Sequence, residues 1–138
     1  MGKSIRDVMT SNPTTIGADE PVTRAARMMR DEDVGVAPIV DGDRLVGTVT
    51  DRDITIRVVA EGKDPETTSV REIASTRLVT IDPQQDLDEA IRLMAEHQVR
   101  RLPVVEEDGR LVGIVAQADV AREGDDSQTG EVVQQISQ

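Results

Sequence analysis

The segment Gly47-Thr48-Val49-Thr50-Asp51-Arg52-Asp53 holds the residues best suited to chemistry. Its pattern predicts that a strand ends and a helix begins here, so free backbone N–H groups and the positive end of the helix dipole would face an anion such as phosphate. The Thr50 hydroxyl adds a further polar group. Asp53, one turn further on, has two oxygens that could accept hydrogen bonds from both hydroxyls of a ribose. The segment is therefore a candidate site for a phosphate and a sugar diol.

The same residues also fit a structural interpretation. Thr50-x-x-Asp53 is a capping box, a common device at helix starts, and Gly47 could simply permit a turn. A second copy of the segment, at 113–119, keeps the aspartate but has Ala116 in place of the capping hydroxyl. An aspartate that persists without its capping partner favours a binding role, although the helix dipole also favours an acidic residue at this position.

The two segments belong to a duplication that covers most of the chain. Matching positions lie 65 residues apart as far as Pro38 and Pro103 and 66 apart thereafter, because the second copy has one more residue in its turn at 106–109. The clearest matches are Ser4-Ile5-Arg6-Asp7-Val8 with Ser69-Val70-Arg71-Glu72-Ile73, and Ala25-x-Arg27-x-Met29 with Ala90-x-Arg92-x-Met94. We assign residues 4–62 to the first repeat, 63–68 to a linker, 69–122 to the second repeat and 123–138 to a polar tail expected to be mobile.

Each repeat has the same predicted order of strand, helix, strand, strand and helix, after an opening helical turn with a capping box (Ser4-x-x-Asp7 and Ser69-x-x-Glu72). Strands are predicted at 14–16, 36–40 and 45–49, then at 78–81, 102–105 and 111–115, with final helices from about 51 and 117. Spacing of i, i+3, i+4, i+7 predicts amphipathic helices with apolar faces Val22, Ala25, Ala26, Met29 and Leu87, Ala90, Ile91, Met94. Asp86 with Glu89 would cap the second of these. We expect an α+β fold in which two pseudo-symmetric repeats pack into one module, because neither repeat is large enough to bury its own sheet and helices comfortably.

The composition excludes several classes of function. The chain of 138 residues has a net charge of −11 and no Cys, Phe, Tyr or Trp. Duplex nucleic acid needs a basic face, so the charge argues against such a partner. Without cysteine there can be no disulfide, thiolate metal site or thiol nucleophile. A nucleobase would have to lie on aliphatic side chains and backbone groups. No apolar run approaches a membrane span and the start lacks a signal-peptide pattern, so we expect a soluble cytoplasmic protein that does not bind membranes.

The repeats resemble a pair of CBS domains, also called a Bateman module. The resemblance runs from about Ser4 to Arg122 and rests on three segments in combination: Val34-Gly35-Val36-Ala37-Pro38-Ile39, Gln98-Val99-Arg100-Arg101-Leu102-Pro103-Val104 and Thr50-Asp51-Arg52-Asp53-Ile54. The chain is similar to small bacterial stand-alone CBS pairs, including those of the hypoxic-response type. This resemblance implies clefts between the repeats that bind AMP, ADP, ATP, NAD or S-adenosylmethionine as a regulatory ligand, with no required cofactor. It also implies homodimers that form a flat disc.

Carried over to this sequence, the resemblance implies two ligand sites. In the first, Thr50 would meet a phosphate and Asp53 the ribose diol, while the other repeat supplies base contacts from 74–79 and 100–103. In the second, Asp119 would pair with 12–14 and 34–38; Ala116 departs there from the family's Thr or Ser, which suits a weaker site or a ligand with less phosphate. The implied ligand-binding residues are Gly47, Thr50, Asp53, Ala74, Arg77, Val79, Arg100, Arg101 and Pro103 for the first site, and Asn12, Thr14, Val36, Pro38 and Asp119 for the second.

Two adjacent arginines, Arg100 and Arg101, allow two interpretations. They could attract a phosphorylated ligand to a net-negative protein, or they could be a solvated pair bound to nearby carboxylates. Alternation along a strand predicts that one points inward and the other outward. The only histidine, His97, lies near a helix end, where exposure or a contact with the helix dipole is expected rather than catalysis.

No motif places a nucleophile beside a base, so we expect no enzymatic activity and no metal site. The leading hypothesis is a ligand-sensing module. The alternative is a ligand-free scaffold that binds a partner through its dimer surface, which Ala116 favours and the intact first segment opposes. A stand-alone module must signal to a further protein, which the sequence does not name.

Overall fold

The computed structural model describes residues 2–123 of the chain and contains two compact units. One is the continuous segment Thr14–Leu78, and the other joins Met1–Pro13 to Val79–Gln138. We call them the inner and the outer unit, after their places in the sequence, and describe each by itself. The tail predicted at 123–138 lies outside the described residues except for Glu123. Both units combine a three-stranded sheet with helices, which confirms the predicted α+β class.

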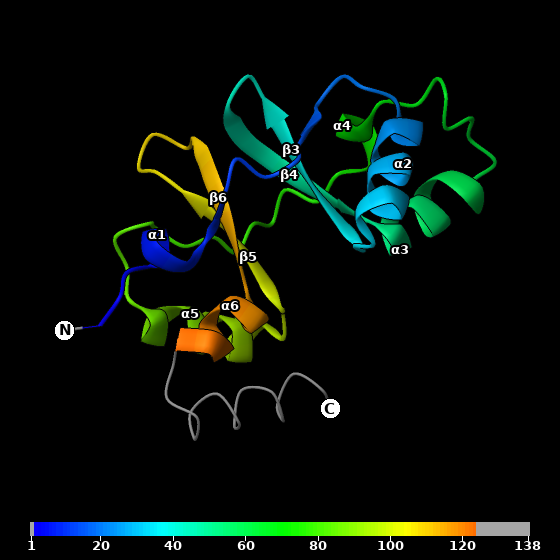
Figure 1. Cartoon of the computed structure of the whole chain (residues 1–138). Coiled ribbons are helices and arrows are strands. Elements are labelled where there is room, and N and C mark those ends of the chain that lie inside the picture. Colours follow the sequence, from blue (N-terminus) through cyan, green and yellow to red (C-terminus); the bar gives the residue numbers. More distant parts are fainter. Residues whose placement is uncertain (1, 124–138) are drawn as a thin grey trace. The chain divides into compact units, whose positions relative to one another are not determined.

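The inner unit builds its sheet in the order β2-β3-β4, with β2 parallel to β3 and β3 antiparallel to β4. Gly42, with a φ of 66°, makes the tight hairpin turn between β3 and β4. Figure 1 labels most of these elements. Their bounds are β2 (Ile16–Gly17), α2 (Val22–Glu32), β3 (Val36–Asp41), β4 (Arg44–Thr50), α3 (Asp51–Ile54), a π-helical turn η1 (Thr55–Val59) and α4 (Val70–Ile73).

The outer unit repeats this plan with a sheet in the order β1-β6-β5, all antiparallel. Ile81 forms a parallel bridge to Val104 of β5, at the place that β2 occupies beside β3 in the inner unit. Asp86 caps α5 by accepting a hydrogen bond from the backbone N–H of Glu89 at 3.0 Å, as predicted. The elements are α1 (Ile5–Val8), β1 (Thr10–Ser11), α5 (Leu87–His97), β5 (Arg101–Val105), β6 (Leu111–Ala116) and α6 (Gln117–Glu123).

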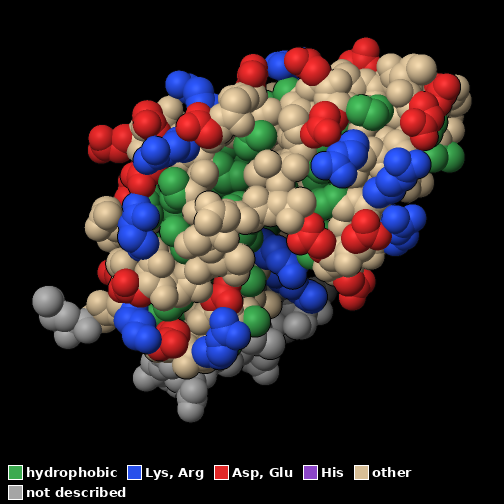
Figure 2. Space-filling model, turned by 45° about the horizontal axis from the view of Figure 1, so that its top comes forward, with side chains coloured by type: hydrophobic (Ala, Val, Ile, Leu, Met, Phe, Trp, Pro, Cys, Tyr) green, Lys and Arg blue, Asp and Glu red, His purple; other side chains and the backbone are tan. Residues whose placement is uncertain are grey.

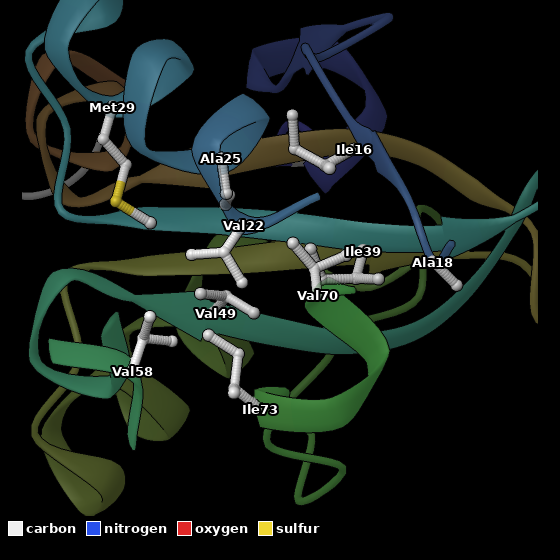
Figure 3. Close-up of a cluster of buried hydrophobic side chains, with 11 residues drawn as sticks. Ile16, Ala18, Val22, Ala25, Met29, Ile39, Val49, Val58, Val70 and Ile73 are labelled. Carbon is white, nitrogen blue, oxygen red and sulfur yellow. The ribbon is translucent and has the colours of Figure 1, made fainter. Parts of the chain in front are cut away.

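Aliphatic side chains alone form the buried core of each unit, as a sequence without aromatic residues requires. In the inner unit, one face of α2 packs on the sheet while Val70 and Ile73 of α4 join the same cluster (Figure 3). In the outer unit, Ile5 of α1 joins the core built by α5, α6 and the sheet. The largest fully buried side chains are Ile16, Val22, Ile39, Val49, Val58, Val70 and Ile73 in the inner unit, and Ile5, Met94, Leu102, Val104 and Val115 in the outer unit.

Each opening helix therefore packs with the sheet of the other repeat. The helix α1 of the first repeat lies in the outer unit, and α4 of the second repeat lies in the inner unit. The segment after each helix continues along a strand: Thr10 pairs with Ile114 of β6, and Ser75 forms a bridge to Thr48 of β4. The chain thus exchanges its opening segments between the two sheets, which the repeat pattern alone did not indicate.

Several local predictions were wrong. The predicted box at Ser69 does not form; the N–H of Glu72 donates to the Ser69 carbonyl oxygen instead, at 3.1 Å. Ala26, predicted on the apolar face of α2, is exposed, whereas Met28 packs against the inner core. Thr14 precedes the first strand of its unit, which begins at Ile16. By contrast, the Ser4 box is confirmed, with the Ser4 N–H donating to Asp7 Oδ2 at 2.9 Å.

Among the described helices, none is long and apolar enough to cross a membrane. On the face drawn in Figure 2, Lys and Arg side chains are scattered among Asp and Glu.

Candidate functional site

The junction between β4 and α3 forms the capping box that its sequence predicts. The Thr50 hydroxyl accepts a hydrogen bond from the Asp53 N–H at 3.0 Å, and the Thr50 N–H donates to Asp53 Oδ2 at 2.9 Å. Asp51 N–H is also used, because it donates to the Gly35 carbonyl oxygen at 3.0 Å. The structural interpretation is therefore confirmed, because Thr50 and Asp53 cap the start of α3. This capping box uses one of the two carboxylate oxygens of Asp53.

The other oxygen of Asp53 is less engaged. Its nearest cation is Arg57 Nε, 3.9 Å from Asp53 Oδ1, which is too far for a hydrogen bond. Arg57 donates instead to the Ile73 carbonyl oxygen at 3.2 Å. The Asp53 side chain is 17% exposed. Among the described residues, Asp53 thus keeps one carboxylate oxygen without a hydrogen-bond donor, at the surface of the inner unit.

The second copy forms only part of the box. The Ala116 N–H donates to Asp119 Oδ2 at 2.8 Å, which matches the contact of Thr50 with Asp53. Ala116 has no hydroxyl to accept the return bond. Asp119 Oδ1 is engaged as well, because Arg122 Nη2 donates to it at 2.6 Å. The two aspartates therefore match in backbone position but differ in what holds their second oxygen.

Gly47 lies inside β4 rather than in a turn, and it is buried. A Cβ atom there would lie 2.9 Å from the Ser75 carbonyl oxygen and 3.1 Å from Ala74 Cβ. Thr48 N–H donates to this Ser75 oxygen at 3.0 Å, and Ser75 N–H donates back to Thr48 at 2.8 Å. Gly47 thus allows the segment that begins at Ala74 to run beside β4, which brings two predicted parts of the first site together within one unit.

Gly113 has the matching role in the outer unit. A Cβ atom on Gly113 would meet the Met9 side chain and would lie 2.9 Å from the Thr10 carbonyl oxygen. The alternative that Gly47 permits a turn is therefore wrong, and Gly113 likewise lies inside a strand, β6. Each glycine instead makes room for the exchanged segment that follows an opening helix.

The remaining predicted site residues are divided between the units. In the inner unit, Val36 of β3 pairs with Thr50, so a residue assigned to the second site lies beside the key residue of the first. In the outer unit, Arg101 of β5 pairs with Ala116, and the Gln117 N–H donates to the Arg100 carbonyl oxygen at 2.8 Å. The inner unit also holds Thr14, Pro38, Ala74 and Arg77, and the outer unit holds Asn12, Val79, Pro103 and Asp119.

The prediction that Arg100 and Arg101 point to opposite sides was wrong. The strand β5 begins at Arg101, so Arg100 lies outside the alternating part, and both side chains are exposed. In the described part of the chain neither makes an ion pair. Of the two interpretations of this pair, binding to nearby carboxylates is therefore not observed among residues 2–123. His97, at the end of α5, is exposed as expected.

Two arginines near the aspartates were not singled out from the sequence. Arg57 and Arg122 follow Asp53 and Asp119 by four and three positions, a spacing at which helical side chains meet. This spacing is the feature of the sequence from which the two arginines could have been identified. No group of three or more His, Asp or Glu residues suited to a metal ion occurs within the described range 2–123.

Comparison with known proteins adds direct information on the family. A model of the CBS domain matches residues 5–60 and 70–126. Hypoxic response protein 1 of Mycobacterium tuberculosis is 47% identical over 118 residues, which are 85% of this chain and 82% of that protein. The CBS domain-containing protein YhcV of Bacillus subtilis is 43% identical over 86% of this chain and 83% of its own length. These relatives therefore consist largely of the matched region.

Solved structures agree with this family. The crystal structure of Hypoxic Response Protein I with two coordinated zinc ions has a TM-score of 0.79 at 44% identity, covering 89% of this chain and 100% of that one. The crystal structure of CBSX2 in complex with AMP has a TM-score of 0.75 at 27% identity, covering 88% and 95%. The CBS domain pair of protein MJ0100, in complex with 5-methylthioadenosine and S-adenosyl-L-methionine, has a TM-score of 0.73 at 26% identity, covering 88% and 95%. The chain belongs to the CBS domain family, as a tandem pair of CBS domains.

Proposed function

We propose that the chain is a regulatory module that binds an adenosine-containing nucleotide in a cleft between its two CBS repeats. The candidates are AMP, ADP, ATP, NAD and S-adenosylmethionine. The observation that carries the proposal is the state of Asp53: its carboxylate is partly exposed, it is fixed in place by the Thr50 N–H, and its Oδ1 accepts no hydrogen bond from the described residues. A carboxylate oxygen in this state is suited to accept hydrogen bonds from a ribose diol.

The relatives support an adenosine ligand in particular. One solved CBS protein holds AMP and another holds 5-methylthioadenosine and S-adenosylmethionine, and both fold as this chain does. These ligands share adenosine and differ in what they carry at the 5′ position. The shared part calls for a diol acceptor and an apolar base pocket, and in this proposal Asp53 would be the acceptor and aliphatic side chains would line the pocket.

The contacts follow from the resemblance and the local geometry. Asp53 would hold the ribose and Thr50 would lie near a phosphate, while the base would meet the segments 74–79 and 100–103. Ala74 already lies beside β4 because Gly47 leaves room for it. Arg100 and Arg101, exposed and without ion pairs among residues 2–123, are available to attract the phosphates of the ligand.

The module acts without catalytic chemistry or a required cofactor in this proposal, and it works in the cytoplasm as a homodimer. Self-association has one supporting feature on the surface: η1 leaves the large apolar side chain of Val59 70% exposed. Light scattering of the purified chain tests this part, and a mass that stays monomeric at high concentration would contradict it.

A panel of nucleotides in a thermal-unfolding assay tests the ligand. AMP, ADP, ATP, NAD and S-adenosylmethionine are added singly, with GMP and CMP as matched controls. A ligand that binds only the folded chain raises its stability by about 2.7 kcal/mol at a concentration of 100 times its Kd. We expect at least one adenosine compound to raise the unfolding temperature by several degrees and the controls to have no such effect. A panel with no adenosine-specific rise would contradict the proposal.

A second function, that of a ligand-free scaffold, is favoured by one observation. The Thr50 hydroxyl and one oxygen of Asp53 are both used inside the capping box, and both oxygens of Asp119 are engaged. If the motif acts only as a helix cap, the chain would act through its surface alone. The same nucleotide panel separates the two functions, because a scaffold gains no stability from any nucleotide.

A further inference from the structure

The two aspartates that the repeat places at matching positions do not have the same surroundings. Each accepts a backbone N–H through Oδ2, at 2.9 Å for Asp53 and 2.8 Å for Asp119. The difference lies in Oδ1, which in Asp119 accepts a hydrogen bond from Arg122 at 2.6 Å and in Asp53 lies 3.9 Å from the nearest cation. Both side chains are largely covered: Asp119 is 12% exposed and Asp53 is 17% exposed.

The difference comes from one exchange between the repeats. Arg122 lies three residues after Asp119, and the residue three positions after Asp53 is Ile56. An isoleucine cannot donate to a carboxylate, and its side chain is 44% exposed. The next matching position also differs, with Arg57 in the first repeat and Glu123 in the second. Arg57 donates to the Ile73 carbonyl oxygen, whereas Glu123 forms an ion pair with Lys3 at 2.9 Å. The first repeat therefore leaves its aspartate open and the second repeat closes it.

We propose that Arg122 masks the Asp119 carboxylate, so that Asp53 is the principal diol acceptor of the two. This inference rests on the proposed function, because it says which of the two repeat motifs holds the ribose. Each carboxylate oxygen has two acceptor sites, so Arg122 occupies one of those on Asp119 Oδ1, and a sugar hydroxyl must either share this oxygen with the guanidinium or displace it. Arg122 is thus a specificity-determining residue that acts beside the site rather than on the ligand.

The expected size of the effect follows from the exposure of the arginine. The Arg122 side chain is 71% exposed, so the ion pair is screened by water and contributes little to stability. Competition from such a pair lowers the fraction of open carboxylate, and the apparent Kd rises by roughly 2- to 6-fold. The mask therefore biases the ligand toward Asp53 without abolishing the second site.

Transferring the arginine to the first repeat tests the inference. Ile56→Arg places a guanidinium three residues after Asp53, and Ile56→Gln is the uncharged control of similar length. We expect calorimetry with AMP to give roughly 2- to 6-fold weaker binding for Ile56→Arg than for Ile56→Gln. Both variants replace the same exposed isoleucine, so any effect of its loss on stability or self-association is shared and cancels in the comparison. Equal affinities of the two variants would overturn the inference.

The reverse exchange is made in a chain whose first site is removed. In an Asp53→Ala background, Arg122→Ile frees Asp119, and we expect AMP to bind roughly 2- to 6-fold more tightly than to Asp53→Ala alone. Equal affinities of the two chains for AMP, or no binding of AMP to either chain, would contradict the proposal that Arg122 masks Asp119. Failure of the proposed function is distinguishable from both results, because in that case the parent chain binds no adenosine nucleotide at all.

Discussion

Replacing Asp53 by alanine removes the group on which the proposed ligand site depends. Asp53 Oδ2 is held by the Thr50 N–H at 2.9 Å, whereas Oδ1 has no donor among the described residues. A ribose hydroxyl bound to Oδ1 alone contributes about 1.5–3 kcal/mol, and a second hydroxyl that shares Oδ2 adds a similar amount at most. We therefore expect Asp53→Ala to weaken binding of AMP by at least about 10-fold, and by on the order of 100-fold if both hydroxyls are held.

The assay is isothermal calorimetry with AMP, made on variants shown to be folded. Asp53 also closes the capping box, a contribution of about 1 kcal/mol to stability, so affinity rather than stability must be compared. Asp53→Asn is the matched control for this, because its amide oxygen can still accept the Thr50 N–H. Asp119→Ala is the control for the second repeat, and we expect it to change affinity much less. If Asp53→Ala binds AMP as tightly as the parent, the motif is only a helix cap and the site is wrongly assigned.

The structure makes three further predictions. Gly47→Ala places a Cβ 2.9 Å from the Ser75 carbonyl oxygen, so urea unfolding should show a loss of about 1–3 kcal/mol, and an unchanged midpoint would contradict the close approach. Leu102→Ala opens a cavity at a fully buried position and should cost about 2–5 kcal/mol in the same assay; a loss below that range would place Leu102 outside the core. The hydrogen bond from the Ser4 N–H lowers the pKa of Asp7 below its ordinary value of 3.8, so this bond stabilises the start of α1 above pH 3.8 and is lost as the pH falls through the lowered pKa. An NMR titration that found Asp7 at or above 3.8 would contradict the capping box.

The order of elements was predictable from the sequence in the first repeat, but in the second repeat the strand predicted at 78–81 is reduced to a single bridge at Ile81. Short apolar runs around Ile39 and Val104, each followed by turn residues, predicted the strands, and both predicted hairpins form. The duplication was a strong aid, because each assignment in one repeat checked the same assignment in the other. The helix boundaries were also close, since Asp86 caps its helix by local contacts that the sequence contains.

The exchange of opening segments was not predictable in this way. The strand β1 consists of two exposed polar residues, Thr10 and Ser11, which carry no hydrophobic period. Its place beside β6 depends on contacts between positions about 100 residues apart. The sequence did contain one signal, because Gly47 and Gly113 recur inside strands, where a glycine often marks the close approach of another backbone.

The engagement of the two aspartates also lay beyond the repeat pattern. Matching sequence predicted that Asp53 and Asp119 would be equivalent except for the hydroxyl of Thr50. Their actual difference depends on which side chain follows one helical turn later, Ile56 or Arg122. The spacing allowed such a contact, but spacing alone does not decide which of several nearby cations binds a carboxylate.

A crystal structure of the chain grown with saturating AMP is the most direct test of the central claim. We expect a well-ordered nucleotide whose ribose hydroxyls lie within hydrogen-bond distance of Asp53 Oδ1, and a lower occupancy for any nucleotide at Asp119. A nucleotide bound only away from Asp53, or density for none at saturating concentration, would contradict the claim.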